Sequence, residues 1–144
     1  MTDMNRISPE ALIAFASDVI ETLGATASRA RVTAEVLAAA DLRGISSHGV
    51  AGGTGLRELV DRSRLDAIDT AALPEIQRKE GWAVASMNAN GGLGATAAME
   101  AAQLAGDLAE EYGTGKVHVH DGNHFGAACV YVEALIERGF AARA

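Results

Sequence analysis

The chain has 144 residues, of which 49% are hydrophobic, 22% charged and 4% aromatic, and its formal net charge is −7. A chain of this length and apolar content can bury a core, which excludes a wholly disordered protein. The acidic balance provides no basic field for nucleic acid or for an anionic membrane surface, so we expect neither as a partner.

Cysteine usage and the apolar runs indicate the compartment. Cys129 is the single cysteine and lies in an apolar setting, which is typical of a reduced protein without disulfides. No apolar run approaches the length of a membrane span, and residues 1–5 lack the basic and apolar character of a signal segment. We therefore expect a cytoplasmic protein.

The first part of the chain is predicted to be helical. Ser8 and Pro9 favour a helix start, because the hydroxyl can cap free amides and proline suits the first turn, and Gly24 ends the apolar periodicity. A second helix is predicted from about Ser28 to Leu42, with Arg29 among the charged residues expected largely off its apolar face.

A glycine-rich loop follows over residues 45–55, and a short helical piece is expected from Leu56 to Val60. The later elements alternate in type. Strands are predicted at 74–77, 82–87 and 116–120, and helices at 95–112 and 126–138. Helices first, then strand–helix–strand–helix, indicate an α/β fold in a single unit of residues 1–144, helical over 1–66 and mixed over 67–144.

The first chemical motif is Ser47-His48 in the glycine-rich loop. Imidazole exchanges protons near neutral pH at little cost, and a neighbouring hydroxyl can orient or polarise it. The structural alternative is a surface histidine whose ring caps the preceding helix.

The second motif is Asn123-His124-Phe125-Gly126, placed between a strand end and a helix start, where α/β proteins often bind ligands. The amides of Phe125 to Ala128 would be free donors of that helix, able to face an anion or a cofactor phosphate. Alternatively, Asn123 caps the helix and His124 is merely its exposed neighbour.

Two further patterns are weaker. His118 and His120 point to the same side of a strand and could bind zinc with Asp121 or His124, but the spacing favours a solvated strand face because no cysteine pair or carboxylate completes a tetrahedron. Gly92 to Ala97 has the G-x-G-x-x-A form of a dinucleotide-binding turn, but the same glycines also permit a tight strand-to-helix turn.

Taken together, three segments resemble the malate/L-lactate dehydrogenase family of non-Rossmann NAD(P)-dependent oxidoreductases: Ala39–Val50, Asn90–Gly94 and Asn123–Ala128. That family includes ureidoglycolate and sulfolactate dehydrogenases and piperideine-2-carboxylate reductases. The resemblance covers nearly the whole chain in order and with matching spacing. It implies a different dinucleotide-binding fold and so argues against the Gly92–Ala97 interpretation.

The resemblance implies roles for particular residues. Ser47 and His48 match the catalytic pair, in which the histidine exchanges a proton with the substrate, and His124 is a rival for that role. The cofactor-contacting turn corresponds to His124, Phe125, Gly126, Ala127 and Ala128. The implied reaction is hydride transfer between NAD or NADP and a small 2-hydroxy acid, 2-oxo acid or cyclic imino acid, and no metal is implied.

The chain also departs from the family pattern. Many members carry an arginine for the substrate carboxylate four residues after the first histidine, where this chain has Gly52; Arg57 is the candidate replacement. Members are also more than twice as long, so the chain corresponds to an N-terminal portion of one, expected to be homodimeric when complete. The alternative is a catalytically silent relic or an assembly partner that keeps the family's contact surfaces.

Overall fold

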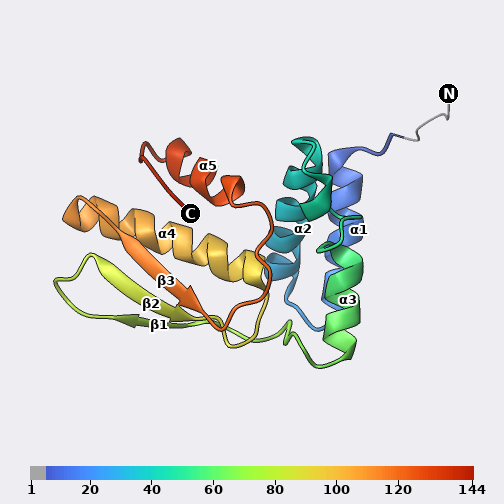
Figure 1. The fold of residues 1–144 in the computed structure, drawn as a ribbon, viewed down its shortest axis with the longest axis horizontal. Coiled ribbons are helices and arrows are strands. Elements are labelled where there is room, and N and C mark those ends of the chain that lie inside the picture. Colours follow the sequence, from blue (N-terminus) through green and yellow to red (C-terminus); the bar gives the residue numbers. More distant parts are fainter. Residues whose placement is uncertain (1–5) are drawn as a thin grey trace.

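The computed structural model describes residues 6–144. The expectation that residues 1–5 form no signal segment therefore lies outside the described residues. Three helices pack together at one end of the molecule, and a sheet with one long helix across it forms the other end (Figure 1). A last helix lies beside the long helix, and the C-terminus returns between them.

The helical end follows the predicted order of elements. Its members are α1 (Pro9–Thr22), α2 (Ala27–Leu42), a single 3-10 turn η1 (Ser46–His48) and α3 (Leu56–Arg64). Ser8 caps α1 as predicted, since its Oγ accepts the Ala11 N–H at 3.2 Å. The helix α3 extends four residues beyond the predicted end at Val60. One apolar cluster joins the three helices, with Ile20 of α1, Ala30 of α2 and Leu56 of α3 all buried.

The sheet has three strands in the order β1 (Glu75–Arg78), β2 (Val84–Asn88) and β3 (Lys116–His120). β1 runs antiparallel to β2, and β2 runs parallel to β3. The crossover between the two parallel strands is α4 (Gly94–Tyr112), which covers one face of the sheet. The α/β fold class is thus confirmed.

The last helix, α5 (Cys129–Glu137), starts three residues later than the predicted start at Gly126. Gly126 has a φ of +79°, a left-handed conformation that a right-handed helix cannot include. The segment from Phe125 to Ala128 is therefore a loop, and its amides are not those of a first helical turn. Tyr131 packs α5 against Val36 of α2 and Ala102 of α4.

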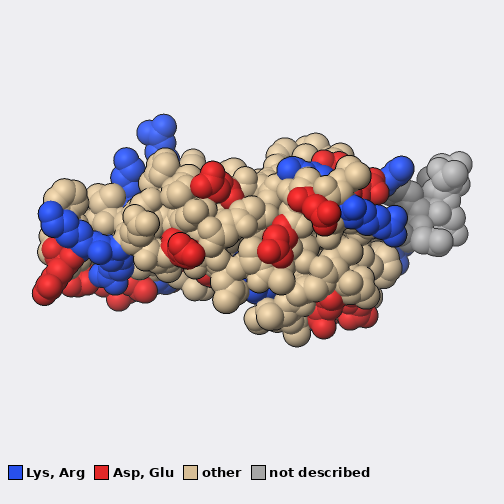
Figure 2. Space-filling view, turned by 90° about the horizontal axis from the view of Figure 1, so that it is seen from below, with Lys and Arg blue, Asp and Glu red and all other residues tan. Residues whose placement is uncertain are grey.

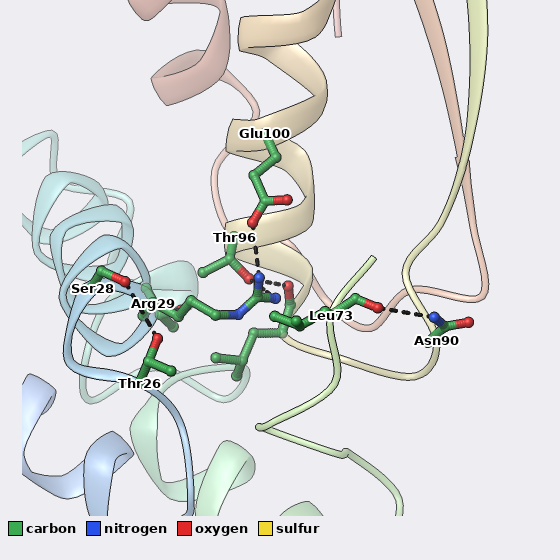
Figure 3. A network of polar contacts seen from close by, with 9 residues as sticks. Thr26, Ser28, Arg29, Leu73, Asn90, Thr96 and Glu100 are labelled. Atoms are coloured by element: carbon green, nitrogen blue, oxygen red, sulfur yellow. Dashed lines mark hydrogen bonds and ion pairs between the residues drawn. The ribbon is translucent and has the colours of Figure 1, made fainter. Parts of the chain in front are cut away.

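Arg29 corrects one prediction for α2. Its side chain is 10% exposed and points across to α4, where it donates to Glu100 Oε1 at 2.8 Å and to Thr96 Oγ1 at 2.9 Å (Figure 3). The residue was expected largely off the apolar face, but a guanidinium can be buried when its donors meet a carboxylate and a hydroxyl. This polar contact ties the helical end of the molecule to α4.

An apolar groove of about 780 Å³ lies between α4, β3, α5 and the C-terminal residues. Small and aliphatic side chains dominate its lining, among them Ala102, Val119 and Leu135. On the face seen in Figure 2, positive and negative side chains lie side by side at the end that holds the β1–β2 turn, and much of the middle is uncharged. Within residues 6–144, none of the helices has the length and hydropathy of a membrane span.

Candidate active site

His48 closes the single turn η1 and is half-buried. The Oγ of Ser47 lies 2.8 Å from its Nδ1, within hydrogen-bond distance. A partner on Nδ1 fixes which ring nitrogen faces outward, so Nε2 is the nitrogen left for another molecule. The alternative, in which the ring caps α2, does not fit, because the hydrogen-bond partner of the ring is the Ser47 hydroxyl and not a carbonyl of α2.

The loop that carries His48 is held by its own backbone. Gly52 N–H donates to the Gly49 carbonyl, Gly55 N–H donates to the Gly52 carbonyl, and the Thr54 hydroxyl donates to the Ser47 carbonyl. The carboxylate of Asp41, on the last turn of α2, accepts the Val50 N–H at 2.8 Å. The imidazole thus stands on a closed loop rather than on a free surface segment.

His124 lies on the loop between β3 and α5, and its place is set by packing on α4. Asn123 Nδ2 donates to the carbonyls of Gly91 and Gly92 at 2.6 and 3.0 Å, so this amide ties two loops together instead of capping α5. A Cβ on Gly94 would lie 2.2 Å from the Asn123 carbonyl oxygen and 2.5 Å from that of His124. The absence of a side chain at Gly94 therefore lets the His124 loop sit against the start of α4.

The other side of the same loop is fixed by α2 and α5. A Cβ on Gly126 would lie 2.6 Å from Val36 Cγ1, so the backbone there touches α2 directly. The buried Tyr131 of α5 donates its hydroxyl to the Phe125 carbonyl, and burial raises the pKa of this phenol well above its ordinary value. Three elements thus determine where the loop can lie.

The two loops bring the histidines together. The ring centroids of His48 and His124 are 5.1 Å apart with the planes tilted by 45°, and the Phe125 ring lies 6.3 Å beyond His124. Partial burial, and to a smaller extent the neighbouring His48, lower the pKa of His124 below 6.5. The site therefore combines a hydroxyl with two imidazoles, and the environment of His124 favours the neutral form of its ring.

Comparison with known proteins assigns the fold that carries this pair. The sequence model of the malate/L-lactate dehydrogenase family matches residues 7–144. The chain belongs to this family. It is 37% identical over 131 residues to a malate/(S)-sulfolactate dehydrogenase of Methanothermus fervidus, covering 91% of this chain and 38% of that protein. A Δ1-pyrroline-2-carboxylate reductase of Agrobacterium fabrum is 26% identical, with 98% of this chain and 40% of that protein covered.

Solved structures agree with the sequence comparison. Malate dehydrogenase from Pyrococcus horikoshii OT3 superposes with a TM-score of 0.84 at 31% identity, covering 94% of this chain and 38% of that one. Δ1-piperideine-2-carboxylate reductase from Pseudomonas syringae gives a TM-score of 0.79 at 26% identity, with 94% and 40% covered. The chain thus spans about two fifths of the length of these relatives, which are dehydrogenases and reductases.

The G-x-G-x-x-A pattern has a structural use within this dehydrogenase-family fold. It does follow a strand and open a helix, since β2, α4 and β3 form a parallel crossover. The space that a Gly94 side chain would occupy is nevertheless filled by the backbone of Asn123 and His124. The corresponding space at Gly92 is bounded by the Ala72 and Ala89 carbonyls. These glycines allow close packing of the His124 loop, as in the alternative interpretation of that turn.

Gly52 stands where the family resemblance led us to expect an arginine, and Arg57 is the candidate replacement. Arg57 lies in the first turn of α3 with a side chain 93% exposed, and its Nε is 3.7 Å from Asp61 on the next turn. Leu56 N–H donates to the Val50 carbonyl, so the start of α3 adjoins the His48 loop. A Cβ on Gly52 would lie 2.5 Å from the Ser46 and Ser47 carbonyl oxygens, so this loop conformation has no room for the family's arginine.

His118 and His120 lie on one face of β3, with ring centroids 6.1 Å apart, and both are exposed. His120 Nδ1 is 2.9 Å from the Asp121 carboxylate. In the part of the chain that the structure describes, no three or more potential ligands gather to hold a metal ion. The exposed histidines of β3 therefore match the solvated strand face better than a zinc site.

Sequence reasoning missed the residues that hold the site in place. Asp41 gave no signal, because a carboxylate at a helix end is ordinarily solvated. The ties made by Asn123 and Tyr131 depend on segments that are distant along the chain. Glycine spacing was the one available clue, since Gly49, Gly52 and Gly55 recur every three residues around the His48 loop.

Proposed function

We propose that this chain carries the proton-transfer site of an NAD(P)-dependent oxidoreductase that acts on a small 2-hydroxy acid, 2-oxo acid or cyclic imino acid. The observation that supports it is the 5.1 Å approach of His48 and His124, each from a different motif. His48 is the proposed acid and base, and Ser47 orients it. Interconversion of an alcohol and a carbonyl requires a proton to move at the substrate oxygen, which an imidazole can do near neutral pH.

Ser47 prepares His48 for this role. When Nδ1–H of His48 donates to Ser47 Oγ, Nε2 is the nitrogen that takes a proton from an alcohol to form the imidazolium. The imidazolium returns this proton from Nε2 to a substrate oxygen or imine nitrogen. The lowered pKa of His124 leaves less of that ring in the protonated form at neutral pH. His124 therefore fits a hydrogen-bonding role in binding, and it remains the rival acid and base.

The loop from His124 to Ala128 fits a nicotinamide dinucleotide in its chemistry. The 42% exposed Phe125 ring beside His124 offers a flat surface for an aromatic ring. When bound, NAD or NADP supplies or accepts the hydride. We assign His124, Phe125, Gly126, Ala127 and Ala128 to this binding role.

Arg57 is the proposed partner of a substrate carboxylate. Its guanidinium is almost fully exposed and its pair with Asp61 at 3.7 Å is weak, so it is free to bind another anion. If this assignment holds, Arg57→Ala raises KM for a 2-oxo acid and leaves kcat nearly unchanged. A kcat loss with unchanged KM would assign Arg57 elsewhere.

The free thiol of Cys129 accords with a reducing compartment, so the proposal places the protein in the cytoplasm. The proposal also keeps the homodimer that the family resemblance implies.

Three experiments test the proposal. Isothermal titration with NADH and NADPH is expected to show micromolar binding, whereas no binding at millimolar cofactor favours the silent relic or assembly partner. Reduction assays with oxaloacetate and with Δ1-pyrroline-2-carboxylate then separate hydroxy-acid from imino-acid chemistry. His48→Ala is expected to lower turnover at least about a hundredfold. An unchanged rate in that variant, with loss in His124→Ala, would move the acid–base role to His124.

A further inference from the structure

A carboxylate of α2 accepts a hydrogen bond from the His48 loop. Asp41 lies on the last turn of α2 and is half-buried. Its Oδ2 accepts the N–H of Val50, two residues beyond His48, at 2.8 Å. A charged acceptor makes a stronger hydrogen bond to a backbone amide than a neutral one does, so this contact is well suited to hold a loop.

Gly49 shows how closely the loop is pressed onto that carboxylate. A Cβ built on Gly49 would lie 1.8 Å from Asp41 Oδ1 and 2.6 Å from Oδ2. No side chain fits in this space, so the backbone next to His48 wraps directly around the acid. The carboxylate thus touches the loop on both sides of the Gly49–Val50 peptide.

The loop beyond Gly49 closes on itself. Leu56 N–H donates to the Val50 carbonyl, and a Cβ on Gly55 would lie 2.2 Å from the Gly49 carbonyl oxygen. These contacts are internal to the segment from Gly49 to Leu56. Asp41 connects this closed segment to α2 by a hydrogen bond, and Val50 and Leu56 also pack on the apolar cluster that contains Ala30 of α2.

The partner imidazole is held from elsewhere. His124 is located by Gly94 of α4, by Val36 of α2 and by the amide of Asn123, none of which belongs to the His48 loop. The separation of the two rings therefore depends on two sets of contacts that share the helix α2 but no residue. A shift in either set changes the distance between the rings.

We propose that Asp41 is a positioning residue of the candidate active site: its carboxylate fixes the His48 loop and thereby sets the 5.1 Å approach of His48 to His124. The catalytic meaning of this approach rests on the proposed function. The geometric claim stands on the loop contacts alone. Asp41 acts through the loop and is assigned no contact with substrate.

The test is an NMR comparison of the two imidazoles in the chain without cofactor. In the unaltered chain we expect a nuclear Overhauser effect between the two rings and a His124 pKa below 6.5. In Asp41→Ala we expect the effect to disappear and the His124 pKa to rise, because His48 no longer lies against it. Asp41→Asn keeps an acceptor for Val50 N–H and is expected to keep both signals.

Two controls complete the test. Asp61→Ala removes an exposed carboxylate from α3 and is expected to change neither signal. If Asp41→Ala does not fold, Asp41→Glu replaces it, because the extra methylene displaces the same acceptor and should weaken the effect between the rings. A folded Asp41→Ala or Asp41→Glu with both signals intact overturns the proposal. Since no step needs NADH, this outcome leaves the titration result for the proposed function untouched.

Discussion

Gly94→Ala is a direct test of how the His124 loop is placed. The new Cβ would lie 2.2 Å from the Asn123 carbonyl oxygen, whereas ordinary contact begins at 3.4 Å, so that oxygen must retreat by about 1.2 Å. The obstacle is backbone on both sides, because the His124 carbonyl lies at 2.5 Å. Overpacking of this kind costs about 1–3 kcal/mol of unfolding free energy.

The same displacement bears on function. A misplacement of about 1 Å at a catalytic group can cost about a hundredfold in rate, so Gly94→Ala should impair turnover as well as stability. Urea unfolding measures the stability change, and the ring-to-ring Overhauser effect between His48 and His124 measures the displacement.

Gly53→Ala is the matched control. Gly53 lies in the His48 loop with no atom within 4 Å of a built Cβ and with no positive φ. We expect this variant to stay within about 0.5 kcal/mol of the unaltered chain. The reasoning is refuted if Gly94→Ala is as stable as Gly53→Ala and keeps the contact between the two imidazoles.

Two further predictions concern buried and titrating charge. Glu100→Gln should lower the unfolding free energy by about 2–3 kcal/mol, less than for a fully buried pair because Glu100 is 39% exposed, whereas Arg29→Met should cost under about 1 kcal/mol. Urea titrations of both variants check the order, and the reverse order contradicts it. For His124, the native pKa lies below 6.5, so the unfolded chain binds the proton more readily and stability should fall as pH drops below about 6.5. His124→Asn should flatten that decline between about pH 7 and pH 5, and an unchanged slope would show that the histidine is not responsible.

Local pattern predicted those elements whose ends are set by local chemistry. β3 has the predicted bounds, Lys116–His120, because apolar and polar residues alternate between two glycine-containing turns. Ser8 and Pro9 likewise located the start of α1. The start of α5 was wrong, because the backbone of Gly126 adopts its left-handed conformation against Val36, a contact that no local pattern contains.

Side chains with distant partners were the least predictable. Arg29 looks like a surface charge in its own helix, and its carboxylate partner Glu100 lies 71 residues further along the chain. The meeting of His48 with His124 was indicated by the family resemblance and not by the spacing of either motif. Asp41 needed the structure, since its role depends on how the Gly49 backbone folds back onto it.

The described contacts separate the chemistry of the candidate site into two parts. The supports of the imidazole pair, Asp41, Gly94, Val36 and Tyr131, all lie within this chain. The approach of the two imidazoles is therefore supported by contacts within this chain. Recognition of a substrate carboxylate is different, because Gly52 leaves no room for the family's arginine and Arg57 is held by a single weak ion pair. It follows that loss of substrate selectivity and loss of the histidine pair should be separable by mutation, the first through Arg57 and the second through Asp41 or Gly94.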